Sequence, residues 1–231
     1  MFPGLNALWC MLLAWLIGSI PFSLLIARWI GGFDLRTRGS GNVGATNVAR
    51  TMGTRWGLAA LLLDALKGAL PVWGLPLLFR IPNESFTLVS VLTGVAAILG
   101  HMFPLWLRFR GGKGVATALG VVVVLAPLAM GCALAVFVVT FLISRVVSLS
   151  SMAGAVAFTI AQISLHGTEL WGAQRALGIF SLAVPLLIIV RHWANIGRLW
   201  RGEEKPLQIQ KKRTLVETPA AGVENDHPDA A

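Results

Sequence analysis

The chain has 231 residues, of which 56% are hydrophobic and only 13% are charged, and its mean hydropathy is +0.75. A soluble domain carries about a quarter charged residues, so this composition excludes an ordinary soluble protein and predicts an all-α, polytopic membrane protein. The net charge of +9 does not indicate a nucleic-acid-binding protein, because the basic residues stand in short segments between apolar stretches, as in cytoplasmic loops.

Six apolar segments follow one another along the chain. They are residues 5–30, 56–79, 86–107, 114–144, 146–165 and 176–190. As one helix the fourth would be about 46 Å long, which exceeds the roughly 30 Å of hydrocarbon in a bilayer. It contains Pro127 and Gly131, so we expect a break near residues 128–132 that divides it into two short spans. The sequence therefore predicts about seven transmembrane helices.

The basic residues set the expected orientation. They gather after the first, third and last apolar segments, and only seven spans place all three groups, with Arg145, on one side. That side should be cytoplasmic, with the N-terminus outside and the C-terminus cytoplasmic. We expect one transmembrane domain over residues 1–205 and a polar, disordered cytoplasmic tail over residues 206–231.

The first polar segment, residues 38–50, is richer in glycine and in hydrogen-bonding side chains than a membrane loop requires. Its glycines permit close backbone approach, and successive N–H groups in such a loop can form an anion-binding nest. A loop that caps a helix through Ser40 or Asn42 is the simpler interpretation. The whole combination favours a phosphate-binding site, whose predicted residues are Ser40, Gly41, Asn42, Thr46, Asn47 and Arg50.

The second polar segment, residues 100–117, places a lysine between glycines at an expected helix start. It resembles a nucleotide-binding loop, but no Ser or Thr follows Lys113, so ATP or GTP binding is not predicted. A lysine at that place suits a single phosphate group. His101 lies nearby, and both a structural and a functional role stay open for it. The predicted phosphate contacts are Gly111, Gly112, Lys113 and Gly114.

The third polar segment, residues 191–205, follows the last apolar stretch. His192, Asn195 and Arg198 recur at a spacing that keeps them near one face of a helix. A basic stop signal that binds anionic lipid would explain the arginines, but it does not explain His192 and Asn195. We therefore predict that His192, Asn195 and Glu204 belong to the site.

Two ionisable residues, Asp64 and Lys67, lie inside the second apolar segment. Their i, i+3 spacing allows an ion pair that lowers the cost of placing charge in a membrane. A salt bridge that supports the site and a direct contact with substrate are equally open interpretations.

Together these segments resemble the bacterial PlsY family, the acyl phosphate:glycerol-3-phosphate acyltransferases. The resemblance rests on residues 18–22, 40–50, 64–68, 100–104, 111–117 and 192–199, and it covers the chain up to about Lys205. It implies a seven-helix enzyme of the bacterial plasma (inner) membrane with a cytoplasm-facing active site. The implied reaction moves a fatty acyl group from acyl phosphate to the sn-1 hydroxyl of glycerol 3-phosphate, giving lysophosphatidic acid and phosphate in phospholipid synthesis.

The resemblance also implies roles for individual residues. The implied phosphate ligands are Ser40, Asn42, Arg50 and Lys113. The side chains implied to line the acceptor site are His101, His192 and Asn195. The implied catalytic residues are His101, Ser40 and Lys113. The chain departs from the family where one residue usually separates Glu from Lys, because Lys205 directly follows Glu204, and this leaves the role of Lys205 open.

An acyl phosphate is a mixed anhydride with a good leaving group, so its enzyme needs mainly positioning and charge neutralisation. The closely spaced histidine–aspartate pair of better-known glycerolipid acyltransferases is absent, because Leu105 and Trp106 stand where the aspartate would follow His101. His101 or a phosphate oxygen of the substrate is the expected base. No metal or other cofactor is predicted, and Cys10 and Cys132 offer no metal-ligand spacing.

The expected partners are glycerol 3-phosphate, acyl phosphate, membrane lipid and the enzyme that makes acyl phosphate, without nucleic acid. The fatty chain should lie in a groove between helices that is open to lipid. A transporter or channel for an anionic solute is the main alternative, since Asp64 and Lys67 could mark a polar path, but the internal repeats that it predicts are not visible. An acyltransferase that uses a thioester donor is a second alternative.

Overall fold

The chain folds into helices throughout the part that the structure describes. This computed structural model describes residues 4–207, and no strand occurs among them. The α-helices are α1 (Leu5–Gly18), α2 (Phe22–Trp29), α3 (Ala45–Met52), α4 (Thr54–Leu78), α5 (Asn83–Met102), α6 (Val115–Leu125), α7 (Pro127–Ser144), α8 (Val147–His166), α9 (Arg175–Arg191) and α10 (Trp193–Trp200). The all-α prediction is confirmed, whereas the expected tail from residue 208 onward lies outside the described residues.

Five helical segments of the described chain are long and apolar enough to cross a membrane. They are Leu5–Trp29, Thr54–Leu78, Asn83–Leu107, Pro127–Ser144 and Val147–Trp171. A sixth is formed by α9 and α10 only if this pair, bent by 59°, is taken as one span. The apolar α6 has 11 residues and is about 16 Å long, which is shorter than a full crossing. The polytopic helical class is confirmed, with five or six spans by this measure against the seven predicted.

Two of the expected apolar segments are broken. The fourth breaks at Ala126, between α6 and α7, which is slightly earlier than the predicted 128–132. Pro127 is the first residue of α7, a position where its missing N–H costs no helical hydrogen bond. The first segment was expected to be continuous, but it breaks at residues 19–21, where Pro21 precedes α2.

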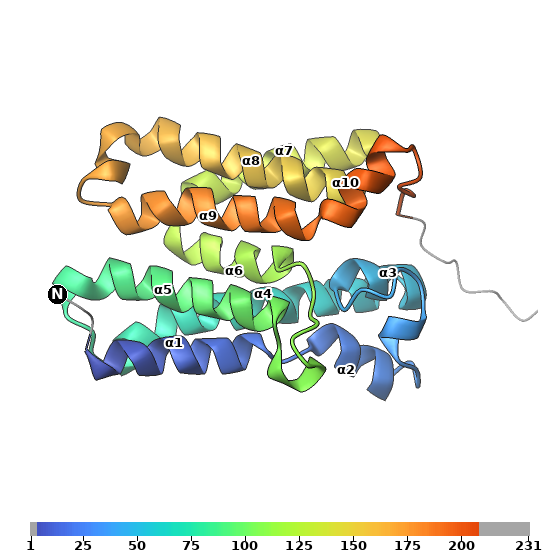
Figure 1. The fold of residues 1–231 in the computed structure, drawn as a ribbon, viewed down its shortest axis with the longest axis horizontal. Coiled ribbons are helices and arrows are strands. Elements are labelled where there is room, and N and C mark those ends of the chain that lie inside the picture. The colour runs from blue at the N-terminus through green and yellow to red at the C-terminus, as the bar shows by residue number, and fades with distance from the viewer. Residues whose placement is uncertain (1–3, 208–231) are drawn as a thin grey trace, which may run out of the picture.

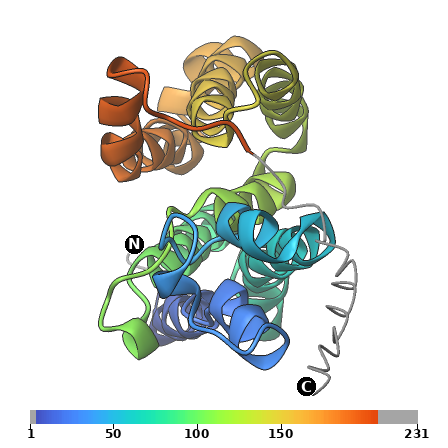
Figure 2. The ribbon, with the colours of Figure 1, turned by 90° about the vertical axis from the view of Figure 1, so that its right-hand side faces the viewer.

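The helices form two groups that lie one above the other in Figure 1. One group holds α1 to α6, and the other holds α7 to α10. The end view in Figure 2 shows the same division, with α6 leading from the first group into the second. Within the groups α1 packs on α5, α4 on α6, α7 on α8 and α8 on α9, and between the groups α5 contacts α9. The polar segments 30–53, 103–114 and 192–207 gather toward one end of the molecule (Figure 1).

Glycines allow α4 and α6 to approach closely. A Cβ atom added to Gly120 would lie 1.8 Å from the carbonyl oxygen of Ala65, and one added to Gly68 would lie 2.3 Å from that of Thr117. Small residues permit this kind of backbone contact between membrane helices. The close packing fixes the start of α6, and with it Lys113, relative to Asp64 on α4.

Candidate functional site

A cavity of about 1050 Å³ lies between the two helix groups. The three polar segments that the sequence singles out meet on its wall. Predicted site residues that line it are Ser40, Gly41, Asn42, Thr46, Asn47, Arg50, His101, Lys113, Gly114, His192, Asn195 and Glu204. The ion-pair residue Asp64 lines it as well, whereas Gly111 and Gly112 do not. The fold therefore brings together most of the predicted site from positions far apart in the sequence.

The loop before α3 is held together by the buried side chain of Asn47. Its amide nitrogen donates to the carbonyl oxygens of Leu35, Arg38 and Asn42 at 3.2, 3.0 and 3.0 Å, and its oxygen accepts from the backbone N–H of Ser40 at 2.9 Å. Every polar atom of this side chain is thus engaged within the loop. Asn47 supports the loop from inside. Its neighbours on the cavity wall remain the candidates for direct contact with phosphate.

Glycine is required at two points of the same loop. Gly39 and Gly41 have φ values of +61° and +70°, a region that other residues rarely adopt. A Cβ atom on Gly39 would also lie 2.1 Å from the side-chain oxygen of Asn47. The glycines of this segment therefore allow the tight turn that presents Ser40 and Asn42 to the cavity.

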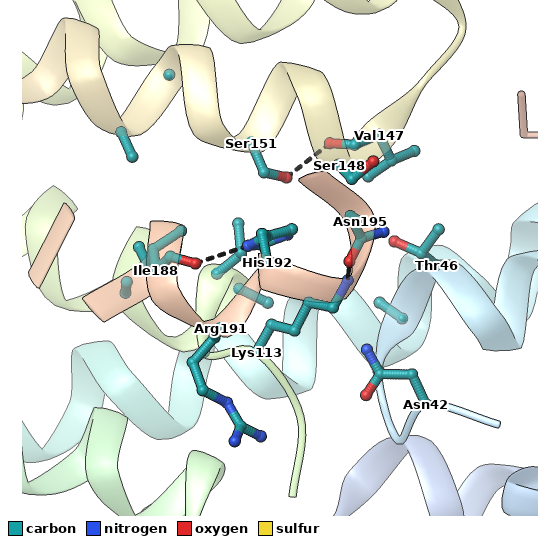
Figure 3. A pocket seen from close by; sticks show the side chains of 18 of the residues that line it. Asn42, Thr46, Lys113, Val147, Ser148, Ser151, Ile188, Arg191, His192 and Asn195 are labelled. Carbon is teal, nitrogen blue, oxygen red and sulfur yellow. Dashed lines mark hydrogen bonds between the residues drawn. The ribbon is translucent and has the colours of Figure 1, made fainter. Parts of the chain in front are cut away.

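Lys113 reaches across the cavity to the second helix group. Its ammonium group donates to the side-chain oxygen of Asn195 on α10. Figure 3 shows this contact, with Asn42 and Thr46 on the facing wall. Burial lowers the pKa of Lys113 to about 8, and the positive charges of Arg198, Arg191 and Arg50 lower it further, while Glu204 opposes the shift. An incoming phosphate would favour the charged form of this lysine.

Glu204 is the centre of a hydrogen-bonded cluster beside Lys113. Its carboxylate accepts from the Ser148 hydroxyl at 2.6 Å, from the Asn195 amide at 2.5 Å and from the Arg198 guanidinium at 2.5 Å. Burial alone would raise the pKa of this carboxyl, but the three donors outweigh it and hold the pKa below its ordinary value. Glu204 lines the cavity, and its hydrogen bonds orient Asn195 and Arg198 there.

Gly111 and Gly112 shape the turn before Lys113. Their N–H groups donate to the carbonyl oxygens of Met102 and His101 at 3.0 and 3.2 Å, so these N–H groups are already used within the protein. A Cβ atom on Gly112 would lie 2.2 Å from His101 Nε2. Neither glycine lines the cavity, and their contact with phosphate stays a prediction.

Arg191, at the end of α9, is a site residue that the sequence interpretation did not single out. Its Nη2 donates to the carbonyl oxygens of Gly111 and Gly112 at 3.2 and 2.9 Å, and the side chain lines the cavity. Its guanidinium also lies over the ring of Phe103, 5.5 Å from the centroid. In sequence this residue could not be distinguished from the other arginines that mark a cytoplasmic helix end.

Asp64 and Lys67 form the predicted ion pair, with Lys67 Nζ 2.8 Å from Asp64 Oδ1 and both side chains buried. Lys67 also donates to the carbonyl oxygen of Ile20 at 2.7 Å, at the break between α1 and α2. Ser23 donates to the other carboxylate oxygen at 3.3 Å. The pair therefore joins α4 to the broken first span, which favours the supporting role.

His101 faces this pair from α5. Its Nδ1 lies 3.8 Å from Asp64 Oδ1, which is longer than a hydrogen bond. The sequence lacked a closely spaced histidine–aspartate motif, but the fold brings a histidine and an aspartate together from different helices. Both side chains line the cavity, so His101 stands where a base could contact a substrate hydroxyl.

His192 lies at the bend between α9 and α10, and it is buried. Its Nδ1 is 2.8 Å from the carbonyl oxygen of Ile188, drawn as a dashed line in Figure 3. Because a carbonyl oxygen can only accept, Nδ1 must carry the proton. In the neutral ring Nε2 is then free to accept a hydrogen bond from a bound hydroxyl group.

Comparisons with known proteins agree with this geometry. A family model described as glycerol-3-phosphate acyltransferase matches residues 8–202. Two similar relatives carry the same name: one from Myxococcus xanthus is 47% identical over 84% of this chain and 96% of its own length, and one from Gluconobacter oxydans is 45% identical over 87% and 92%.

Two crystal structures of PlsY, an integral membrane glycerol 3-phosphate acyltransferase, have the same fold. The glycerol 3-phosphate form superposes with a TM-score of 0.76 and 38% identity over 87% of this chain and 96% of that one. The lysophosphatidic acid form gives a TM-score of 0.74 and 37% identity over 87% and 94%.

Proposed function

Because this chain belongs to the glycerol-3-phosphate acyltransferase family, we propose that it moves a fatty acyl group from acyl phosphate to the sn-1 hydroxyl of glycerol 3-phosphate. It is a membrane acyltransferase of phospholipid synthesis, and the alternative of a transporter or channel is not favoured. The products are lysophosphatidic acid and phosphate. The observation that carries the proposal is one cavity that combines cationic side chains with an adjoining apolar section.

The polar part of the cavity suits two phosphate groups. Arg50, Lys113, Arg191 and Arg198 all line it and come from α3, the loop before α6, α9 and α10. Arginine forks and a lysine near a helix start bind phosphate oxygens well. We assign Ser40, Asn42, Arg50 and Lys113 to substrate phosphate. His192 and Asn195 line the wall on which the acceptor glycerol is expected.

The chemistry follows from this arrangement. The sn-1 hydroxyl oxygen attacks the acyl carbonyl carbon, a new C–O ester bond forms, and the bond between the acyl carbon and the phosphate oxygen breaks. The hydroxyl proton passes to His101 or to a phosphate oxygen, and inorganic phosphate leaves. Because the donor is an activated anhydride, most of the rate enhancement must come from positioning and from neutralising phosphate charge.

The apolar part of the cavity suits the fatty chain. Its lining residues on α6 to α9 include Leu119, Leu134, Phe137 and Ile188, and Leu134 is an exposed side chain of α7. A chain could therefore reach this space from the surrounding lipid. The predicted groove between helices agrees with this geometry.

The proposed enzyme crosses the bacterial inner membrane seven times. The seven spans are the five long segments, α6, and α9 with α10, with the N-terminus outside and the C-terminus in the cytoplasm. This arrangement places the polar loops and the mouth of the cavity on the cytoplasmic side, where glycerol 3-phosphate is found. We also expect the enzyme that makes acyl phosphate to be a partner at this surface.

The proposal is tested by assaying purified protein with a long-chain acyl phosphate and labelled glycerol 3-phosphate. Lys113→Ala and Arg50→Ala should each reduce kcat/KM by about a hundredfold or more, because each removes charge stabilisation from the transition state. Arg55→Ala, at the start of α4 and outside the cavity lining, is the matched control. Activity with acyl-CoA alone would reject the donor, and unchanged activity of both variants would reject the phosphate assignments.

A further inference from the structure

Beyond its polar residues the cavity continues as an apolar shaft between α6, α7, α8 and α9. The shaft is lined by buried small residues, namely Ala118, Ala133, Gly154 and Ala155. At Gly154 the two helices of the α7–α8 pair come so close that an added Cβ atom would lie 3.1 Å from the carbonyl oxygen of Ala133. Small residues on this wall therefore leave room for an extended hydrocarbon chain beside the closely packed α7 and α8.

Larger side chains lie at the far end of this shaft. Val122, Phe158 and Val184 are the lining residues of α6, α8 and α9 that lie furthest along each helix from Lys113, Ser148 and His192. At 1.5 Å per residue, Phe158 lies about 15 Å from Ser148 and Val184 about 12 Å from His192. All three side chains are at most 5% exposed. We call Val122, Phe158 and Val184 the floor of the shaft.

The centre of the floor is rigid. The ring of Phe158 packs edge-to-face against Phe180, with centroids 6.3 Å apart and planes at 85°. Phe180 is itself 2% exposed and belongs to the same core cluster, together with Leu177. An aromatic ring held in this way cannot rearrange as a flexible methionine would. Phe158 is also four residues after Gly154 on one face of α8, so the wall of small residues ends at its ring.

From this geometry we propose that Phe158 is a specificity-determining residue, which ends the shaft and limits the length of the acyl chain that reacts. The inference rests on the proposed function of the same cavity. A fatty chain that moves from lipid into the shaft passes between two apolar surroundings, so its transfer alone discriminates little between lengths. Steric exclusion does discriminate, because a chain that is too long pushes its carbonyl away from the phosphate-binding residues, and displacement by about 1 Å can cost about a hundredfold in rate.

The test measures kcat/KM of purified full-length protein over a series of saturated acyl phosphates from decanoyl to stearoyl, at one glycerol 3-phosphate concentration. Phe158→Ala should lengthen the shaft and raise the stearoyl-to-myristoyl ratio by about tenfold. Ala155→Leu should narrow the shaft above the floor and shift the ratio toward shorter chains. Phe79→Ala is the control for a lost ring, since Phe79 packs with Ala7, Cys10 and Val89 outside the cavity.

An unchanged chain-length profile in both cavity variants would overturn the inference, as would an equal shift in the control. If Phe158→Ala does not fold, the chain-length profiles of Phe158→Leu and Ala155→Leu still test whether Phe158 limits the length of the acyl chain. Thermal protection of each variant by lysophosphatidic acids of the same lengths gives a readout without turnover. If the wild-type protein uses no acyl phosphate of any length, the proposed function fails, whereas a normal wild-type rate with unshifted variants contradicts the floor alone.

Discussion

Lys113 is the residue through which pH should act most directly on this site. Its pKa of about 8 means that the ammonium is largely charged at neutral pH and loses its charge as pH rises through that value. The pKa of Lys113 is lowered by burial and by the neighbouring positive charges. Phosphate binding needs the charged form, so the free enzyme should bind substrate less well in alkaline solution.

We expect kcat/KM for glycerol 3-phosphate to fall above about pH 8, by up to about tenfold per pH unit, because that constant reports the free enzyme. In Lys113→Arg the guanidinium does not titrate in this range, so the alkaline fall should disappear even if the rate is lower. Initial rates of both proteins between pH 6 and pH 10 measure this fall, with the folding of each protein checked at pH 6 and at pH 10. An alkaline fall with the same midpoint in both proteins would assign it to another group.

Arg191 should hold in place the turn that carries Lys113. Loss of its two hydrogen bonds to the carbonyl groups of Gly111 and Gly112 should free the turn that carries Lys113. Hydrogen bonds from a charged group are worth about 1.5–3 kcal/mol, so Arg191→Gln should lower kcat/KM by about tenfold to a hundredfold. Arg191→Lys should recover part of this loss, because an ammonium can still reach one carbonyl.

The matched control for this prediction is Arg201→Gln, directly after α10, where the exposed arginine pairs with Glu203. Titrating phosphate against both purified proteins separates binding from folding. Equal rates for Arg191→Gln and Arg201→Gln, with both proteins folded, would show that the turn does not depend on Arg191.

At this scale the sequence predicted the types of residue in the site better than their individual roles. Lys113, Asn195 and His192 reach the cavity as predicted. Asn47, Gly111 and Gly112 were also predicted to bind phosphate, yet their polar atoms are bonded within the protein. Composition and spacing identify a polar loop, but which of its atoms remain available depends on how the loop folds back on itself.

Helix contacts through glycine support the site at the scale of the elements. Gly120→Ala should destabilise the protein by about 3 kcal/mol, because the new methyl group meets the backbone of α4 at Ala65, and backbone cannot move as a side chain can. Gly74→Ala, also within a membrane helix, has no atom within 4 Å of the added methyl and should be neutral or slightly stabilising. Thermal unfolding of both variants in one detergent distinguishes them, and equal melting temperatures would contradict the packing argument.

The positions of helix breaks show why elements were only partly predictable. Pro127 begins a helix and Pro21 precedes one, whereas Pro71, Pro76 and Pro185 lie inside unbroken helices. In a membrane a helix tolerates proline when neighbouring groups satisfy the freed backbone. A proline therefore marks a candidate break, and the surrounding packing decides whether the chain changes direction. The length of the fourth segment predicted its division, whereas the first segment is shorter and its Pro21 alone did not predict a break.

For the whole molecule, the labelling of single cysteines distinguishes the proposed seven spans from six. In a protein with Cys10 and Cys132 replaced by alanine, single cysteines at Arg55 and Arg145 should react with a membrane-impermeant reagent only after the cells are opened. A single cysteine at Gly172 should react in intact cells. If residues 114–144 crossed only once, Arg145 and Arg55 would lie on opposite sides, and labelling of Arg145→Cys in intact cells would reject seven spans.

The overall fold was predictable to the level of an all-helical membrane protein with polar loops meeting at one end. The division into two helix groups was not, because it depends on the shortness of α6 and on which apolar faces meet. The cavity between the groups exists because α7 packs mainly on α8, while α5 contacts α9. Hydropathy along a chain does not encode such choices, since lipid-facing and helix-facing surfaces are equally apolar.

The buried ion pair on α4 has a consequence for how the chain enters the membrane. A lone charged residue at the centre of a span costs about 2.5–3.5 kcal/mol at insertion. Because Asp64 and Lys67 lie one turn apart on the same helix, they can neutralise each other while the nascent segment is still leaving the translocon. We expect this span to need no previously inserted companion to shield its charges, so its integration should depend little on the order in which the other helices arrive.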